Sequence, residues 1–474
     1  DIRSGGEAPA LVASEGEVGL LSLQNGLSGG DLRDLDVEGD WTVPDPVMET
    51  DLAVHAPAGI GRVVTRGDIV GDIVTEGDVA SVVSIGGDLT GEISAGGDVG
   101  TVKVIGGNLS GSVDVEGNLT VAIAISRDGT GGNISGEMDV EGNVRVLKTV
   151  NGSIGAIEVD GDLTVGQAIN GAIGGPVYVG EDLTIMKALE GSIENDVTVS
   201  GDARVVQTVQ GDLQGALEVG GSVTMLKTVG GSVTGNVSVE GDLRVVVTVG
   251  GGISGDLTVG TEEEESDIAV VRTVGGNIAG DLSATGSVGA VISVGHAALG
   301  GNITGDLTAE SGLGNISARG DLADCSVEVI GRLNRVAVGG DLAGATIDIE
   351  SGALNALRVG GSVQNSLLEL RDGAGDLSGK FSRAVVRNDF YNSTIRAGRL
   401  GRVIVGGEIS EDDTDGTEDE ICAAAGRFLV RDENENRWIE DNRFLELYEA
   451  LFEGVPTWVD TEPEEILPEF PDLL

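Results

Sequence analysis

Residues 221–240 read GSVTMLKTVGGSVTGNVSVE, and residues 241–260 read GDLRVVVTVGGGISGDLTVG. The two stretches match position by position, so the chain repeats with a period of 20 residues. Each repeat holds two runs in which aliphatic residues alternate with other residues, as at Val233, Val237 and Val239. Alternation is typical of a β-strand with one buried face, and the glycine that opens each run is typical of a tight turn. The pattern predicts coils of two strands each.

The same pattern extends from about Ile60 to Ile409, with a looser register after Gly312. Coils of constant length predict an all-β fold, a single long β-solenoid (β-helix) whose successive coils stack around a shared aliphatic interior. Helices are excluded over this range because apolar residues recur at every second position and because glycine costs roughly 1 kcal/mol at each helical site. These arguments leave the handedness of the solenoid open.

Insertions of five residues interrupt the period only where a turn is expected. They fall near Arg127–Gly131, Thr261–Glu265 and His296–Gly300. An insertion inside a strand would turn its buried face to solvent, whereas an insertion at a corner only enlarges a loop. The stretch 371–400 departs furthest from the repeat, and we expect a local excursion there.

Three parts of the chain are expected. Residues 1–60 form an N-terminal cap or assembly segment, and residues 61–410 form the solenoid. Residues 411–474 form an acidic linker and a small mixed C-terminal module, in which Asn442–Gly454 has the apolar spacing of a short helix and the tail 464–474 is expected to be extended. A lone coil buries too little surface to offset the entropy of ordering it, so the end coils need caps or a partner.

The composition excludes several classes of function. The chain carries 79 acidic and 28 basic side chains, and its net charge of −51 repels nucleic-acid phosphates and anionic lipid surfaces. No nucleic-acid partner is therefore expected, and no membrane insertion, because no apolar run is long enough to cross a bilayer. With only three Trp, three Tyr and six Phe, the interior must be aliphatic. Acid-rich surfaces with few lysines suit high salt or an exterior that binds divalent cations.

Asp256, Asp281 and Asp306 occupy the same position in three consecutive repeats. Stacked coils lie about 4.8 Å apart. Like charges at such a distance favour a bound cation, and carboxylate oxygens are ligands for Ca²⁺. The sequence predicts a Ca²⁺ site at these three residues. The alternative is a solvated acidic face that keeps the protein soluble, and the nonapeptide of calcium-binding β-rolls does not occur.

Two further rows of equivalent residues are explained by structure alone. Asp and Asn tolerate turns and hydrogen-bond their own backbone, which accounts for a row at the second residue of the first run: Asp78, Asp98, Asn118, Asn143, Asp162, Asp182 and Asp202. A threonine row resembles the flat arrays of ice-binding solenoids: Thr208, Thr228, Thr248 and Thr273. The row beside it is irregular, so we expect ordinary strand residues rather than an ice-binding surface.

Catalytic groups are scarce. His55 and His296 are the only histidines, which excludes a His-based triad or a His-rich metal site. No enzyme is expected. Cys325 and Cys422 permit either one disulfide or two free thiols, and both alternatives stay open.

The runs GSVTGNVSVE (231–240), GGDLTGEISAG (86–96) and GNLSGSVDVE (107–116) resemble the strand repeats of bactofilins, polymer-forming β-helical proteins that join end to end. They also resemble glycine-rich β-solenoid regions of large bacterial and archaeal cell-surface proteins. The resemblance implies a solenoid that associates with copies of itself and carries no catalytic residues.

From this resemblance and the repeat we expect an extracellular structural protein, the subunit of a filament or surface layer. Assembly would be head to tail, through the coil ends and the non-repeat termini, with the tail 464–474 docking on a neighbouring copy as a donor strand does. The alternative is a monomeric stalk or adhesin region of a larger surface protein. Cell-surface glycans are a further class of partner, which a polysaccharide-active β-helix would bind in a groove.

Overall fold

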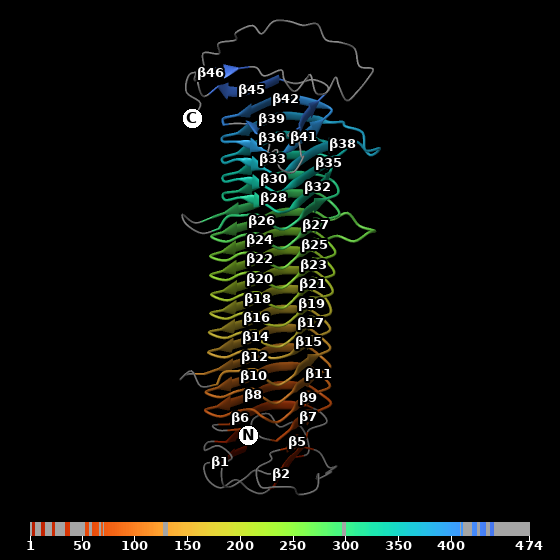
Figure 1. Cartoon of the computed structure of the whole chain (residues 1–474). Helices are drawn as coiled ribbons and strands as arrows, with labels where there is room; N and C mark the ends of the chain where they lie inside the picture. Colours follow the sequence, from red (N-terminus) through yellow and green to blue (C-terminus); the bar gives the residue numbers. More distant parts are fainter. Residues whose placement is uncertain are drawn as a thin grey trace. The chain divides into compact units, whose positions relative to one another are not determined.

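The structure is a computed structural model of the chain. It describes residues 59–126 except 66, 67 and 70, residues 131–295 and residues 300–407, together with the backbone of short strands before and after these ranges. The chain divides into two compact units, unit 1 (Asp1–Thr248) and unit 2 (Val249–Leu474). All elements of the described residues are β-strands, and each unit is a parallel β-solenoid (Figure 1). The predicted fold class is confirmed.

One coil of unit 1 shows how the repeat folds. It begins with the long strand β8 (Val79–Ile85), turns at Gly86, passes through a single bridging residue, Leu89, and continues into the short strand β9 (Ile93–Ala95). The long strands stack as sheet A and the short strands as sheet B. The bridging residues form a third row of parallel bridges, such as Leu89 to Leu109. The two predicted strands per coil are present, and the third row adds a side that the sequence pattern did not predict.

Sheet A of unit 1 contains these strands: β1 (Ile2–Ser4), β3 (Leu21–Leu23), β6 (Ile60–Thr65), β8, β10 (Val99–Ile105), β12 (Leu119–Ile125), β14 (Val144–Val150), β16 (Leu163–Ile169), β18 (Leu183–Leu189), β20 (Ala203–Val209) and β22 (Val223–Val229). Sheet B of unit 1 contains these strands: β2 (Leu11–Ser14), β4 (Asp34–Val37), β5 (Ala53–His55), β7 (Ile73–Thr75), β9, β11 (Val113–Val115), β13 (Met138–Val140), β15 (Ile157–Val159), β17 (Val177–Val179), β19 (Val197–Val199), β21 (Leu217–Val219) and β23 (Val237–Val239). The long strand β24 (Leu243–Val249) lies at the boundary of the units.

Unit 2 has the same two sheets and a third. Its sheet A contains these strands: β26 (Ile268–Val274), β28 (Val288–Val294), β30 (Leu313–Ala318), β33 (Leu333–Val338), β36 (Ala353–Val359), β39 (Lys380–Val386), β42 (Arg399–Val405), β45 (Arg427–Asp432) and β46 (Arg437–Ile439). Its sheet B contains these strands: β25 (Leu257–Val259), β27 (Leu282–Ala284), β29 (Leu307–Ala309), β32 (Ser326–Ile330), β35 (Thr346–Glu350), β38 (Leu367–Arg371), β41 (Thr394–Ala397) and β44 (Glu420–Ala423). Sheet C contains these strands: β31 (Leu322–Ala323), β34 (Leu342–Ala343), β37 (Val363–Gln364), β40 (Phe390–Tyr391) and β43 (Ile409–Ser410).

The register confirms the predicted insertions. Leu89 pairs with Leu109, 20 residues away, but Leu109 pairs with Ile134, so five extra residues lie between β12 and Ile134. Thr261–Glu265 forms a loop between β25 and β26. The predicted excursion lies at 372–379, where Arg371 and Leu377 form an antiparallel bridge before β39 resumes the parallel register.

The repeat changes character after Gly312, as the looser register predicted. The single bridging residue becomes a two-residue strand of sheet C, beginning with β31, and the short strands of sheet B lengthen from three residues to five at β32. Phe381 and Phe390 are fully buried in this part of unit 2. In unit 1 the corresponding interior positions hold Ile, Leu, Val, Ala and Met.

Two kinds of glycine shape the corners. The residue after many long strands has a left-handed φ, for example 82° at Gly86, and glycine adopts this conformation without a steric penalty. Gly111 serves a different purpose, because a Cβ built on it would lie within 3.0 Å of the carbonyl oxygen of Gly91 in the coil beneath. The coils therefore touch backbone to backbone at this corner, and only glycine permits the approach.

The threonine row that resembled an ice-binding array lies inside the solenoid. Thr208, Thr228, Thr248 and Thr273 are at most 1% exposed. The Thr228 hydroxyl donates a hydrogen bond of 2.9 Å to the carbonyl of Gly231, three residues further on, which stabilises the corner. Because the hydroxyls face inward, they cannot form a surface for ice.

Thr208 and Thr228 offer a matched test of this inner row. The Thr208 hydroxyl is buried without a hydrogen-bond partner in the described structure, whereas the Thr228 hydroxyl has one. Removing an unpaired buried hydroxyl removes a desolvation cost, but removing a paired one leaves its acceptor unsatisfied. We expect T228V to lower the free energy of unfolding by about 1 kcal/mol and T208V to leave it unchanged or raise it. Urea denaturation followed by circular dichroism measures both, and equal losses would contradict the assignment.

The segments that were predicted to depart from the repeat contain short strands. Before residue 60, β1 pairs with β3, and β2 pairs with β4, both in parallel. After residue 410, β44 and β45 continue sheets B and A in parallel, and β46 pairs with β45 antiparallel. The predicted helix at Asn442–Gly454 and the tail 464–474 lie outside the described residues, and the capping roles of both ends stay predictions.

Candidate interaction surface

Rows of Asp, Asn and Ser at the corners hydrogen-bond one coil to the next. A side-chain oxygen of each accepts a hydrogen bond from the backbone N–H of the equivalent residue in the following coil. Along the predicted turn row, Asp78 accepts from Asp98 at 2.8 Å, Asp162 accepts from Asp182 at 3.0 Å, and Asp182 accepts from Asp202 at 2.8 Å. We predicted bonds to the residue's own backbone; the partner is instead the next coil, because stacking brings its N–H closer.

Asp256, Asp281 and Asp306 belong to a corner row of the same kind in unit 2. The Asp256 carboxylate accepts from the N–H of Asp281 at 3.0 Å, Asp281 accepts from Asp306 at 2.9 Å, and Asp306 accepts from Ser326 at 2.6 Å. One oxygen of each carboxylate thus has a structural role. Within the described ranges, no group of three or more His, Cys, Asp or Glu side chains is placed to hold a metal ion. The Ca²⁺ site at these residues stays a prediction.

The hydrogen bonds and neighbours of the carboxylates move their pKa values in opposite directions. The backbone N–H and the side-chain amide of Asn118 donate to Asp98, which lowers the pKa of that carboxyl below 3.8. In sheet B, partial burial together with the charges of Asp114, Asp160 and Glu137 raises the pKa of Asp139 above 3.8. The Asp98 carboxylate is therefore stabilised in the charged form, whereas the Asp139 carboxylate is destabilised in it.

The outward residues of sheet B form an acidic row in each unit. In unit 1, Asp114, Asp139 and Glu158 lie side by side in consecutive strands, and none of them forms an ion pair with a described residue. Like charges stacked at about 4.8 Å repel one another. At low salt, this row therefore destabilises unit 1 when all three carboxylates are ionised.

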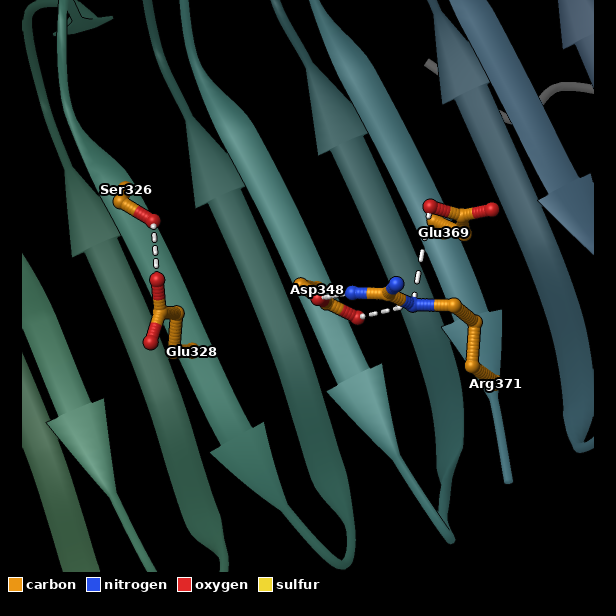
Figure 2. Close-up of polar contacts among 5 residues, drawn as sticks. All are labelled: Ser326, Glu328, Asp348, Glu369 and Arg371. Carbon is orange, nitrogen blue, oxygen red and sulfur yellow. Dashed lines mark hydrogen bonds and ion pairs between the residues drawn. The ribbon is translucent and has the colours of Figure 1, made fainter. Parts of the chain in front are cut away.

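In unit 2 an arginine offsets the acidic row. Figure 2 shows Glu328, Asp348 and Glu369 on β32, β35 and β38, with the Arg371 side chain reaching over the last two. The Arg371 guanidinium pairs with Asp348, and its Nε lies 3.6 Å from Oε2 of Glu369. At the other end of the row, the Ser326 hydroxyl donates to Oε1 of Glu328 at 3.3 Å. Arg371 thus neutralises part of the negative charge of this row.

The cysteines and histidines are the remaining candidate residues, and the structure describes the side chain of Cys325. Cys325 is a free thiol, 5% exposed, and its burial, with a smaller effect from Asp306 and Asp324, raises its pKa to about 12. A thiol that stays protonated at neutral pH is chemically inert. Cys422 lies in β44, whose side chains are not described, as is also true of His55 in β5; His296 lies outside the described residues.

The outer face of sheet A in unit 1 differs from the outer face of sheet B and from the corners, which carry acidic residues. Sheet A of unit 2 shares this property, since its strands from β26 to β42 contain no Asp or Glu. The strands β8, β10, β12, β14, β16, β18, β20 and β22 contain no Asp or Glu, although the chain has 79 acidic residues. Outward positions instead carry aliphatic, basic and uncharged polar side chains, the last mainly threonines at the second strand position. We call this surface, formed by the outward residues of these eight strands, the sheet A face.

Three rows of side chains, most of them half-buried, run along the sheet A face. Two rows are aliphatic over most of their length. The row at the third strand position includes Val121, Val146, Val165, Ile185, Val205 and Met225. The row at the seventh position is formed by Ile85, Ile105, Ile125, Val150, Ile169, Leu189, Val209 and Val229. A partly exposed apolar surface of this regularity makes the sheet A face a candidate contact site.

The middle row, at the fifth strand position, contains four of the five lysines in the chain. It is formed in register by Val83, Lys103, Ile123, Lys148, Gln167, Lys187, Gln207 and Lys227. A lysine occupies every second coil, so the charges avoid being direct neighbours. Arg145 and Arg204 lie at the second position of β14 and β20, and these six cations form no ion pair with any described residue.

The sequence carried the signal for this face, but sequence reasoning missed it. The composition showed only that lysines are few. Aligning the repeats by strand position would have shown that Lys103, Lys148, Lys187 and Lys227 share one outward position. What the structure adds is that the flanking aliphatic residues lie on the same side.

No match to the chain was found among protein-family models, curated proteins or solved structures. Among the residues that are described, no helix is long and apolar enough to cross a membrane. The fold and the sheet A face therefore provide the basis for assigning a function.

Proposed function

We propose that this chain is an extracellular structural protein that assembles end to end with copies of itself into a filament or surface layer. The chain catalyses no reaction and serves as a structural subunit, in which parallel coils repeat at a constant spacing. The acid-rich, lysine-poor composition supports a place outside the cell, where high salt or divalent cations screen its charge.

The observation that carries this proposal is the constancy of the inter-coil contacts. In unit 1, β10, β12, β14, β16, β18 and β20 each pair in register with a long strand on either side. A finite stack of parallel coils ends in strand edges, and a coil of another copy offers the donors and acceptors that such an edge needs. A contact between unlike ends does not close on itself, so it propagates into a filament.

One observation favours the alternative, a monomeric stalk or adhesin region of a larger surface protein. The strand β46 pairs antiparallel with β45, whereas the other pairings described within sheet A of unit 2 are parallel. A reversed strand interrupts the parallel ladder at that point, as a cap does.

Electron microscopy and analytical ultracentrifugation of the purified chain decide between the two. We expect filaments or sheets that lengthen with protein concentration and with salt, because screening removes repulsion between copies of charge −51. Monodisperse monomers at all concentrations of NaCl and Ca²⁺ would reject assembly and favour the stalk.

A further inference from the structure

We propose that the sheet A face binds the C-terminal segment 444–474 of a second copy of the chain. The inference rests on the proposed function, self-assembly, and assigns it a lateral contact in addition to the coil ends.

The sheet A face is complementary to a partner that is both acidic and apolar. Lys103, Lys148, Lys187 and Lys227 form no ion pair in the described structure, although acidic residues are abundant elsewhere in the chain. Their side chains are half-buried, with the apolar stems beside aliphatic neighbours and the ammonium groups free to reach a partner. A ligand of carboxylates alone would leave the flanking aliphatic rows exposed, and an apolar ligand alone would leave the ammonium groups unpaired.

The segment 444–474 has this composition. It contains nine Asp and Glu residues and no Lys, Arg or His, and carboxylates alternate with large apolar residues, as in EEILPEFPDLL. Opposite charges on the two surfaces would steer the encounter and fix its register. The apolar residues, including Trp458 and Phe470, would cover the aliphatic rows.

The prolines of the segment favour the face of a sheet over its edge. Pro456, Pro463, Pro468 and Pro471 have no N–H to donate, so the segment is poorly suited to extend a strand ladder. Side-chain docking on a face needs no such ladder. The expectation that the tail joins a neighbour as a donor strand is therefore replaced by docking across the strands of sheet A.

The dimensions agree. The lysine row from β10 to β22 spans six coil steps, roughly 29 Å at about 4.8 Å per step. Twenty residues of extended, proline-rich chain reach roughly 62 Å, so one segment covers the whole row. Each chain has one face and one segment, and their contact between copies is heterologous, which lets it propagate.

A peptide corresponding to residues 455–474, labelled with fluorescein, tests the contact on the full-length protein. The face variant K103Q/K148Q/K187Q/K227Q should keep its fold, since Gln167 and Gln207 already occupy the same row. We expect fluorescence anisotropy to show binding to the wild type and at least tenfold weaker binding to the face variant. Binding to K380Q should be unchanged, because Lys380, the one lysine outside the sheet A face, lies in unit 2. Equal affinity for the face variant, or for a scrambled peptide of the same composition, would overturn the proposal.

Charge reversal tests whether the segment comes from a second copy. One variant replaces the four lysines of the face with Glu, and the other replaces Glu464, Glu465, Glu469 and Asp472 with Lys. Circular dichroism and urea denaturation first establish that both variants are folded. Neither variant on its own should associate through this contact. An equimolar mixture should give complexes that contain the two variants in a 1:1 ratio in analytical ultracentrifugation, because the segment of each variant then meets a face of opposite charge on the other.

A mixture that contains no complexes would overturn docking between copies. The outcome is separable from the proposed function. Filaments that form equally well from wild type and face variant, without peptide binding, reject the lateral contact and keep end-to-end assembly. If the peptide binds and the mixed variants form complexes, but the wild type forms no filaments, end-to-end assembly is rejected and the lateral contact is kept.

Discussion

Substitution of Gly111 by Ala is expected to lower the free energy of unfolding of the protein by about 3 kcal/mol, the upper part of the usual range for overpacking a close contact. A Cβ at this position would lie within 3.0 Å of the Gly91 carbonyl oxygen and carbon. The obstacle is backbone, which cannot rotate away as a side chain does. Moving it would break the hydrogen bonds by which the N–H groups of Ser110 and Gly111 reach the Leu89 carbonyl.

Gly166 provides the matched control, because the same substitution should have the opposite sign there. Gly166 lies in β16 at an interior position, where the neighbouring coils have Leu147 and Met186. A Cβ would meet only the Leu163 Cδ2 atom, at 3.4 Å, which is ordinary contact distance. Alanine also removes the entropic cost of glycine in a strand, so we expect G166A to raise the free energy of unfolding by about 0.5–1 kcal/mol.

Urea denaturation of G111A, G166A and the wild type, with hydrogen exchange at the strands around β11, measures both effects. The exchange data locate the loss, because a solenoid unfolds in parts and its neighbours share the damage. Similar midpoints for G111A and G166A would show that the corner at Gly91 and Gly111 relaxes freely, contrary to the backbone contact described above.

The repeat made the solenoid predictable because two constraints coincide at every coil. Val113 and Val115 alternate with Asp114, which fixes the buried face, and the glycines around them fix the turns. The third side escaped prediction because only one residue per coil, such as Leu89, pairs there. A single apolar residue between turns has no periodicity to recognise.

The direction in which a residue points was harder to predict than its strand. The sequence predicted a strand at Thr228 but not the side on which its hydroxyl lies, because a threonine hydroxyl can be exposed or can bond a nearby carbonyl inside, as here with Gly231. The corner carboxylates were likewise assigned to the correct turns, but their partner in the next coil depends on the stacking distance. Sequence spacing gives rows of equivalent residues, whereas stacking determines what each row contacts.

Added salt is expected to raise the thermal stability of the protein, and unit 1 should gain most. Raising NaCl from about 0.1 M to about 1 M shortens the screening length from about 10 Å to about 3 Å. Repulsion within the row of Asp114, Asp139 and Glu158 is then largely removed, together with the wider repulsion that follows from a net charge of −51. We expect the midpoint of thermal unfolding to rise by about 10 °C, the shift that about 3–4 kcal/mol gives in a unit of this size.

The pKa shifts give the same row a defined pH dependence. The pKa of Asp139 is raised in the folded protein, so its destabilising effect is present above that pKa and disappears as the pH falls toward 3.8. The contribution of Asp98 to stability has the opposite sign. Its pKa is lowered in the folded protein, so its stabilising effect is present above 3.8 and is lost as the pH falls through the folded value. Mild acid should therefore relieve the destabilisation at Asp139 before it weakens the corner at Asp98.

Asp139→Asn and Glu218→Gln separate the crowded row from charge in general. Each removes one negative charge from an outward position of sheet B, but Glu218 has Thr198 and Ser238 as its row neighbours, whereas Asp139 lies between two carboxylates. D139N should raise the thermal midpoint at low salt and reduce the gain on adding NaCl, while E218Q should change both much less. Calorimetry at both salt concentrations measures the difference. Equal behaviour of the two variants would mean that the net charge of the chain, rather than the stacking of like charges along one row, sets the salt dependence.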